Sequence, residues 1–254
     1  MNEPSISIVT PTLNAANYLS GCLDSVCSQA YPNVEHFVVD GGSGDATIAL
    51  AEAAPGVSMV VLRGSNQAQA INMGFQRSSG DILAWLNADD RYAPGALELI
   101  ARQFAADETV DVVFGDCLVV DHRGRPLWSE QPGAYDFQRL LRHGNYLPQP
   151  AVFLRRRVLD RVGYLDESFE FGMDYEFWLR LRGCRVQYLP RVLATFCWHP
   201  TSKTARSQIG NWREGLRAAR RHGGGWTLPL AWSFSRMLLT VASQRLEYAV
   251  SARG

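Results

Sequence analysis

The chain of 254 residues is predicted to fold as an α/β protein with a mostly parallel central sheet flanked by helices. Its first half alternates strand signals with helices of roughly 10–13 residues, the pattern of parallel strands joined by crossover helices. The strand runs are short and lack polar alternation, which is typical of strands covered on both faces. Apolar residues make up 46% of the chain, so a disordered protein is excluded.

The first half is expected to contain short strands rich in β-branched and aliphatic residues. They are Ser5–Thr10, Val34–Asp40, Val57–Leu62, Asp81–Leu86 and Val110–Val120. Apolar residues at helical spacing predict helices between them. These helices are Tyr18–Gln29, Asp45–Ala53, Asn66–Arg77 and Pro94–Phe104. A turn at Arg123-Gly124 favours a short hairpin after the last strand.

The second half of the chain has a less regular pattern. We expect helices at Asp136–His143 and Asp174–Arg182, and strands at Ala151–Leu154 and Val186–Leu189. Beyond Ser202 the pattern is wholly helical, with a break at Gly223–Gly225.

A net charge of zero conceals two oppositely charged halves. Residues 1–140 hold 17 acidic and 7 basic side chains, whereas residues 141–254 hold 8 acidic and 18 basic ones. Lys203 is the only lysine of the chain. Because the whole chain is not basic, nucleic acid is not expected as a partner.

The cysteines and the N-terminus favour a cytoplasmic protein. Five cysteines without a C-x-x-C pair indicate buried free thiols in a reducing compartment. The first residues have neither a basic region nor a long apolar one, so they do not form a signal peptide. Trp226–Ala242 is interrupted by Pro229 and Arg236 and is not a convincing membrane span.

Two polar segments follow predicted strands, at the sheet edge where open α/β proteins bind ligands. The segment Asn87–Asp90 places two carboxylates next to each other in the chain. A hard cation such as Mg²⁺ would bind such carboxylates and substrate phosphates at the same time. Asp40–Asp45 is glycine-rich, and its first Asp can accept from a ribose or a base. Each segment is also compatible with a helix cap or a tight turn.

Two further candidates lie in the second half. Asp174 follows Gly172-Met173 near a helix start and can serve as a general base, although an N-cap is the alternative. His199 is a candidate metal ligand or a structural residue. Lys203 suits a phosphate partner.

Taken in order, these segments resemble a family-2 glycosyltransferase of the GT-A fold over Ile6 to about Thr204. The matching pieces are SIVTPTLNAANYL at 7–19, VVDGGSGDAT at 38–47, NQAQAINMGFQRSSGDILAWLNADD at 66–90, QPAVFLRR at 149–156, FEFGMDYEFWLRL at 169–181 and WHPTSK at 198–203. The resemblance implies a GT-A domain at 1–204, with a donor-binding half at 1–120 and an acceptor-side half at 121–204. Residues 205–254 would then form a basic amphipathic helical extension.

The resemblance also implies a chemistry, in which an acceptor hydroxyl attacks the anomeric carbon of a nucleotide-sugar with inversion. Asp174 matches the position of the base. A divalent cation, Mn²⁺ or Mg²⁺, would stabilise the departing diphosphate, with Asp89, the competing Asp90 and His199 as its candidate ligands. The residues that match donor-binding positions are Pro11, Thr12, Asn14, Asp40, Gly41, Ser43, Gln69, Asn72, Asn87 and Lys203.

Two departures from the family pattern keep a second hypothesis open. Asn87 replaces the first Asp of the usual DADD motif, and Met173 replaces the acidic neighbour of the base. A catalytically silent nucleotide-sugar-binding or membrane-docked assembly module is therefore the alternative to an enzyme. A sugar-1-phosphate nucleotidyltransferase is disfavoured, because Pro11–Asn17 contains no cation.

The resemblance favours a UDP-sugar donor over GDP- or dTDP-sugars, and a glycan or lipid-linked glycan acceptor in cell-surface polysaccharide synthesis. Arg213, Arg217, Arg220 and Arg221 lie near helical spacing before an apolar stripe in Trp226–Val241. This pattern favours either peripheral contact with an anionic membrane or packing on the catalytic domain or a second subunit. A homodimer stays open.

Overall fold

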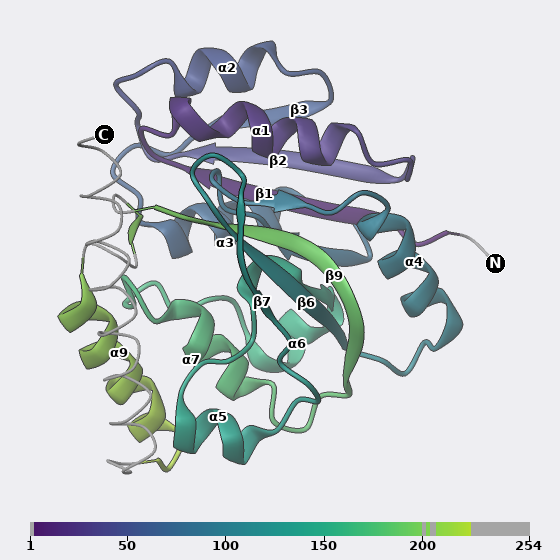
Figure 1. Ribbon diagram of the computed structural model, residues 1–254, viewed down its shortest axis with the longest axis vertical. Coiled ribbons are helices and arrows are strands. Elements are labelled where there is room, and N and C mark those ends of the chain that lie inside the picture. The colour runs from purple at the N-terminus through teal and green to yellow at the C-terminus, as the bar shows by residue number, and fades with distance from the viewer. Residues whose placement is uncertain (1–2, 200–201, 204–206, 225–254) are drawn as a thin grey trace.

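The computed structural model describes residues 3–199, 202–203 and 207–224, which form a mixed α/β domain (Figure 1). Its described strands make one nine-stranded sheet in the order β3-β2-β1-β4-β8-β6-β9-β5, with β7 paired to β6. The predicted α/β fold with a central sheet flanked by helices is therefore confirmed.

The first half of the sheet is parallel, as predicted. It consists of β1 (Ile6–Thr12), β2 (Val34–Asp40), β3 (Val57–Val61) and β4 (Ile82–Trp85). In this register Thr12 lies opposite Asp40, and Val9 lies opposite Trp85. The carboxyl ends of β1, β2 and β4 therefore meet at one edge, where ligands bind in such sheets.

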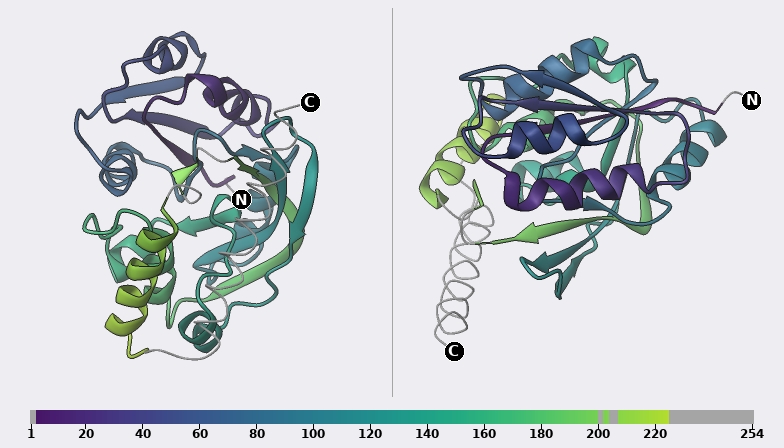
Figure 2. Two further views of the ribbon diagram at one scale, coloured as in Figure 1. Left: turned by 60° about the vertical axis from the view of Figure 1, so that its left-hand side comes forward. Right: turned by 90° about the horizontal axis from the view of Figure 1, so that it is seen from above.

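Helices cover both faces of the parallel strands (Figures 1 and 2). Apolar residues of α1 (Ala16–Cys27), α2 (Thr47–Ala53) and α4 (Ala96–Ala106) pack on one face. Those of α3 (Gln67–Arg77) and α7 (Met173–Arg180) pack on the other. Because Ile6 and Ile8 face one cluster and Val9 the other, this strand is apolar on both sides.

The remaining strands close the sheet with mixed pairing. The strand β8 (Val152–Arg155) runs antiparallel to both β4 and β6 (Val112–Asp121), and β6 runs parallel to β9 (Val186–Trp198). The predicted hairpin forms as β7 (Pro126–Glu130). The other elements are β5 (Arg91–Tyr92), α5 (Phe137–His143), the 3₁₀ turn η1 (Gln149–Ala151) and α6 (Arg157–Val162).

The strand β9 is much longer than the four residues that the sequence predicts. It continues through Pro190 and Arg191, where its pairing with β6 shifts register between Gly115 and Cys117. Proline is tolerated at such an irregularity because the ladder is already interrupted there. The extended strand carries the chain to His199, at the same sheet edge as the ends of β1 and β4.

The helix α9 (Gln208–Arg221) forms the described part of the C-terminal extension. It lies beside α7 in both figures and buries Leu216, Ala218 and Ala219. The apolar stripe predicted in Trp226–Val241 lies outside the described residues. Within the described part of the chain, no helix has the length and apolar character needed to cross a membrane. All five cysteines are free thiols, as expected, but only Cys22, Cys117 and Cys197 are buried; Cys184 is half-buried and Cys27 is exposed.

Candidate functional site

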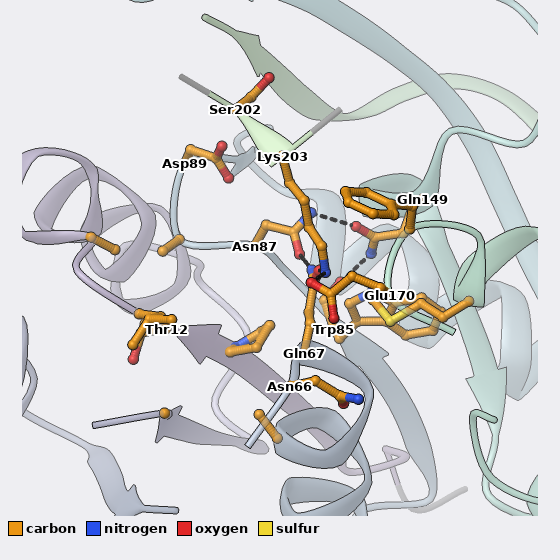
Figure 3. Close-up of a pocket in the computed structure, with 18 of the residues that line it drawn as sticks. Thr12, Asn66, Gln67, Trp85, Asn87, Asp89, Gln149, Glu170, Ser202 and Lys203 are labelled. Atoms are coloured by element: carbon orange, nitrogen blue, oxygen red, sulfur yellow. Dashed lines mark hydrogen bonds and ion pairs between the residues drawn. The ribbon is translucent and has the colours of Figure 1, made fainter. Parts of the chain in front are cut away.

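A cavity of about 980 Å³ opens at the carboxyl ends of β1, β2 and β4 (Figure 3). A cavity of this size can enclose a ligand as large as a nucleotide-sugar. Residues from the acidic half, such as Thr12 and Asp89, form one part of its wall. Residues from the basic half, such as Gln149, Asp174 and Lys203, form the other part. The two oppositely charged halves of the sequence thus meet at the cavity.

Asp89 and His199 form a close polar pair on the cavity wall. The Oδ2 atom of Asp89 lies 2.9 Å from Nε2 of His199. The imidazole stacks on the ring of Tyr18, with 4.5 Å between the ring centroids and 24° between the planes. Stacking by Tyr18, a residue that the sequence analysis missed, fixes the plane of the imidazole beside the carboxylate.

Asp90 is oriented differently from its neighbour Asp89. It is fully buried and does not line the cavity. Its Oδ1 accepts the N–H of Cys197 at 3.0 Å, and its Oδ2 accepts from Nδ2 of Asn87 at 3.1 Å. Burial, and then the charge of Asp89, raise the pKa of Asp90 well above its ordinary value. Because Asp90 anchors β9 near its end, it helps to bring His199 against Asp89.

The donor set at Asp89 and His199 fits a divalent cation that shares its coordination with a substrate. A carboxylate oxygen and an imidazole nitrogen are both metal-ligand types, and here Oδ2 and Nε2 are within hydrogen-bond distance of each other, at 2.9 Å. The described residues contain no cluster of three or more His, Cys, Asp or Glu side chains suited to a metal. Mg²⁺ commonly takes only one or two protein carboxylates and completes its shell with phosphate and water.

Asn87 bonds three other side chains, of which Figure 3 labels Gln67 and Gln149. Its Nδ2 donates to Oδ2 of Asp90 and, at 2.9 Å, to Oε1 of Gln149. Its Oδ1 accepts from Nε2 of Gln67 at 2.7 Å. Gln149 in turn donates to the carbonyl of Trp85 at 2.7 Å. An aspartate in place of Asn87 could not make both donations.

Lys203 crosses the cavity from the C-terminal side. Its Nζ donates to Oε1 of Gln67 at 3.1 Å and pairs with Oε1 of Glu170 at 3.0 Å. The same ammonium lies 5.6 Å from the centroid of the Phe171 ring. Lys203 therefore links the start of α3 to the segment that precedes α7, and it stands where an anionic ligand in the cavity would meet it.

Asp174 lines the cavity from the first turn of α7. Its Oδ2 accepts from Nδ2 of Asn145 at 2.9 Å, and its Oδ1 accepts the N–H of Tyr175 at 2.7 Å. Burial raises the pKa of the Asp174 carboxyl above its ordinary value, although these hydrogen bonds and the charge of Lys203 oppose the shift. A carboxylate with a raised pKa is a better proton acceptor near neutral pH.

Asp40 holds the loop after β2 together and does not line the cavity. Its Oδ1 accepts the N–H groups of Gly42 and Ser43, and its Oδ2 accepts the hydroxyls of Thr12 and Ser43. The Ser43 hydroxyl also accepts from the N–H of Asn14. In this arrangement Thr12, Asn14 and Gly41 face the cavity, while Asp40 and Ser43 support them from behind.

Gln69 and Asn72 are structural parts of α3. Gln69 forms a reciprocal capping box with Asn66, which satisfies two backbone N–H groups at the helix start. Asn72 bonds both backbone polar groups of Leu165 and donates to Glu167. The α3 residues that line the cavity are instead Asn66, Gln67 and Ala70, on the adjoining side of the helix.

The structure thus brings nine of the fourteen predicted site residues to the cavity wall. They are Pro11, Thr12, Asn14, Gly41, Asn87, Asp89, Asp174, His199 and Lys203. Asp40, Ser43, Gln69, Asn72 and Asp90 lie outside the wall. Tyr18, Gln67, Gln149 and Glu170 also line the cavity. They lie in the segments that match the family but are not among the predicted site residues.

Some arginines of the basic face predicted for α9 contact other residues of the protein. The guanidinium groups of Arg217 and Arg221 lie over the ring of Phe169, at 4.3 and 5.1 Å from its centroid. Arg221 also pairs with Asp166. Arg213 and Arg220 are exposed. The described part of the extension therefore packs on the catalytic domain, which is one of the alternatives left open by the sequence.

The parallel strands and the cavity at their carboxyl ends define an α/β protein that has its candidate ligand site at the edge of the sheet. A family model for glycosyl transferase family 2 matches residues 7–163. The chain belongs to this family and is a glycosyltransferase.

Relatives and solved structures agree with this assignment. A PGL/p-HBAD biosynthesis glycosyltransferase of Mycobacterium tuberculosis is 34% identical over 186 residues, which cover 71% of this chain and 70% of the relative. The structure of S. aureus TarS 1–349 in complex with UDP-GlcNAc aligns with a TM-score of 0.71 at 18% identity, over 86% of this chain and 66% of that one.

A second solved structure is similar over the whole chain. The mannosyltransferase PcManGT of Pyrobaculum calidifontis, in complex with GDP-Man and Mn²⁺, aligns with a TM-score of 0.66 at 22% identity. The alignment covers 100% of this chain and 77% of that one. These two likenesses confirm the predicted GT-A fold.

Proposed function

We propose that this glycosyltransferase is a metal-dependent, inverting enzyme that moves a sugar from a nucleotide-diphosphate-sugar to a hydroxyl acceptor. The observation that carries the proposal is that Asp174 and the Asp89–His199 pair line the same cavity. One carboxylate is thereby available to accept a proton, while a separate donor pair is available to hold a cation. The solved relatives with UDP-GlcNAc and with GDP-Man and Mn²⁺ support a donor of this class.

In the proposed reaction the oxygen of the acceptor hydroxyl bonds to the anomeric carbon. As it does so, the carboxylate of Asp174 accepts the hydroxyl proton. The bond between that carbon and the diphosphate oxygen breaks on the opposite side, so the configuration inverts. A cation at Asp89 and His199 would neutralise the charge on the departing diphosphate. Lys203 is the protein cation assigned to the same diphosphate.

The donor nucleotide is proposed to lie along the ends of β1 and β2. Thr12, Asn14 and Gly41 face the cavity there and are its nearest contacts in the proposal. Asp40 and Ser43 act by holding this loop in place. Asp40 would contact the nucleobase of the donor only where the nucleotide displaces one of its present hydrogen-bond partners. A UDP-sugar stays the favoured donor, with GDP- and dTDP-sugars as alternatives.

The acceptor is proposed to be a glycan or a lipid-linked glycan in cell-surface polysaccharide synthesis. The names of relatives that act in PGL/p-HBAD biosynthesis and in O-antigen biosynthesis support this class. The proposal retains a catalytic domain at 1–204, divided near residue 120, and a cytoplasmic location. It adds α9 with its N-cap, which contribute Asn211 and Ser207, respectively, to the cavity wall.

Contact with an anionic membrane through 205–254 is a separate part of the proposal. Arg213, Arg220 and Arg221 are the exposed α9 cations, of which Arg221 also pairs with Asp166, and surface cations of this kind attract anionic lipids. Flotation with anionic vesicles at low and high salt tests it. Failure to float at low salt would remove the membrane contact and leave packing on the domain, or a homodimer, as the role of the extension.

A donor panel tests the central proposal. The protein is incubated with Mn²⁺ and UDP-, GDP- or dTDP-sugars, and released nucleotide is measured with and without glycan acceptors, with EDTA as the metal control. We expect release from one donor class, stopped by EDTA, and a product of inverted anomeric configuration by NMR. Binding of a donor without release for any acceptor would favour the silent module. Unchanged turnover in EDTA would remove the metal.

A further inference from the structure

Glu214 of α9 accepts three consecutive backbone N–H groups from the segment that leads into α7. Its Oε1 accepts from Glu170 at 3.0 Å, and its Oε2 accepts from Phe171 at 2.7 Å and from Gly172 at 2.9 Å. Successive N–H groups that point to one place form a concavity suited to an anion. Here the anion is a side chain from a helix more than forty residues away in sequence.

Two glycines allow α9 to approach the segment 170–172 closely. A Cβ atom on Gly172 would lie 3.3 Å from Cβ of Glu214. A Cβ atom on Gly210 would lie 2.7 Å from Cε2 of Phe171, which is closer than such atoms approach. A larger residue at position 210 would therefore force α9 and Phe171 apart, whereas one at position 172 would require Glu214 to shift by a few tenths of an ångström.

The segment 170–172 leads directly to the proposed base. Gly172 is the N-cap of α7, and Asp174 lies in the first helical turn. The first N–H groups of a helix lack intrahelical partners. The carboxylate of Glu214 accepts the N–H groups of the three residues that immediately precede α7. Phe171 and Glu170 of the same segment also line the cavity. A shift of this segment therefore displaces the base and part of the cavity wall together.

We propose that Glu214 is a positioning residue that fixes the segment 170–172 and thereby holds Asp174 at the cavity. The inference rests on the proposed function, in which Asp174 accepts the acceptor proton. It assigns a task to α9 beyond packing: the C-terminal extension sets the placement of the base. Glu214 contacts the segment before the base directly, whereas it reaches the donor side only through the pair of Glu170 with Lys203, so its loss affects turnover more than donor binding.

The test compares Glu214→Gln and Glu214→Ala with the control Arg221→Gln. Arg221 also joins α9 to the catalytic domain, through Asp166, but it does not touch the segment 170–172. We expect kcat to fall about 100-fold in Glu214→Ala, since a small misplacement of a reacting group costs about that much. Glu214→Gln keeps an acceptor oxygen, so its kcat should lie between those of Glu214→Ala and the wild type. The donor KM should change much less than kcat, because Glu214 reaches the donor side only through the pair of Glu170 with Lys203.

Melting temperatures, measured on the same proteins, separate positioning from folding. Arg221→Gln should lower the melting temperature without lowering kcat. If Glu214→Ala and Glu214→Gln keep wild-type kcat, or if Arg221→Gln lowers kcat as much as they do, the positioning role is overturned. Asp174→Asn is assayed alongside: if it keeps full turnover, the proposed base is wrong and the inference falls with it. Loss in Asp174→Asn with full turnover in both Glu214 variants overturns the positioning role alone.

Discussion

The carboxylate of Asp89 and the imidazole of His199 lie 2.9 Å apart although 110 positions separate them in the chain. Asp89 follows the parallel strand β4, and His199 follows the long strand β9. Asp90 ties the two segments together through its hydrogen bond from the Cys197 N–H. The two neighbouring aspartates therefore have different tasks, one toward the cavity and one toward the fold.

Because only Asp89 faces the cavity, its isosteric replacement should weaken Mn²⁺ binding more than that of Asp90. Asp89→Asn should weaken Mn²⁺ binding by about 100-fold or more, because it removes the charged ligand, whereas Asp90→Asn, which removes only a supporting charge, should weaken it less, by about tenfold. Calorimetric titration of Mn²⁺ in the presence of the donor measures both. A larger loss in Asp90→Asn than in Asp89→Asn would reverse the assignment.

Asn87 predicts that restoring the acidic residue typical of the family is harmful. In Asn87→Asp the donor to Asp90 and Gln149 is lost, and a new carboxylate faces the buried Asp90. We expect a loss of about 1–3 kcal/mol in the free energy of unfolding, the cost of an unsatisfied buried polar group. Urea denaturation measures it. An equal or higher stability in Asn87→Asp would show that the network does not depend on the amide.

Lys203 offers a chemical test because it is the only lysine. An amine-reactive reagent can modify only this side chain and the N-terminal amine. We expect bound donor with Mn²⁺ to protect Lys203, and Lys203→Met to raise the donor Kd by about tenfold through loss of one charge-assisted contact. Mass spectrometry of the modified peptide and a binding titration give the two readings. Equal modification with and without donor would place Lys203 away from the diphosphate.

His36 predicts how stability depends on pH. It is buried against Thr10, 2.9 Å from that hydroxyl, and burial lowers its pKa to about 4 from 6.5. As the pH falls, the His36 imidazole is therefore protonated in the unfolded chain before it is protonated in the folded one. Its contribution to the free energy of unfolding is fully present above about pH 6.5 and is lost as the pH drops toward 4. The loss reaches about 3 kcal/mol. His36→Gln, which does not titrate, should flatten this part of the profile in urea unfolding; an unchanged slope would assign the dependence to other groups.

The parallel half of the fold could be predicted because its signals are local. Val34–Asp40 has the predicted bounds, and the α3 helix begins one residue after the predicted start because Asn66 is its cap. The long β9 could not be predicted, since Pro190 and Arg191 interrupt the apolar run and only the register shift against β6 accommodates them. The place of α9 beside α7 depends on contacts distant in sequence.

The candidate site was predictable where a motif coincides with a strand end. Thr12, Asn87 and Asp89 reach the cavity in this way. In α3, Gln67 rather than the predicted Gln69 lines the cavity, because the two residues are two positions apart on a helix and therefore face different directions. Glu214 lies within a basic helix, and its task follows only from the backbone groups that it meets in three dimensions.

The most direct test of the account is sugar transfer by Asp174→Asn, measured together with donor binding. We predict that kcat falls by at least about 100-fold, the contribution expected of a general base, while the donor Kd in the presence of Mn²⁺ stays unchanged. Turnover within a few-fold of the wild type would contradict the central claim that Asp174 accepts the acceptor proton in this cavity.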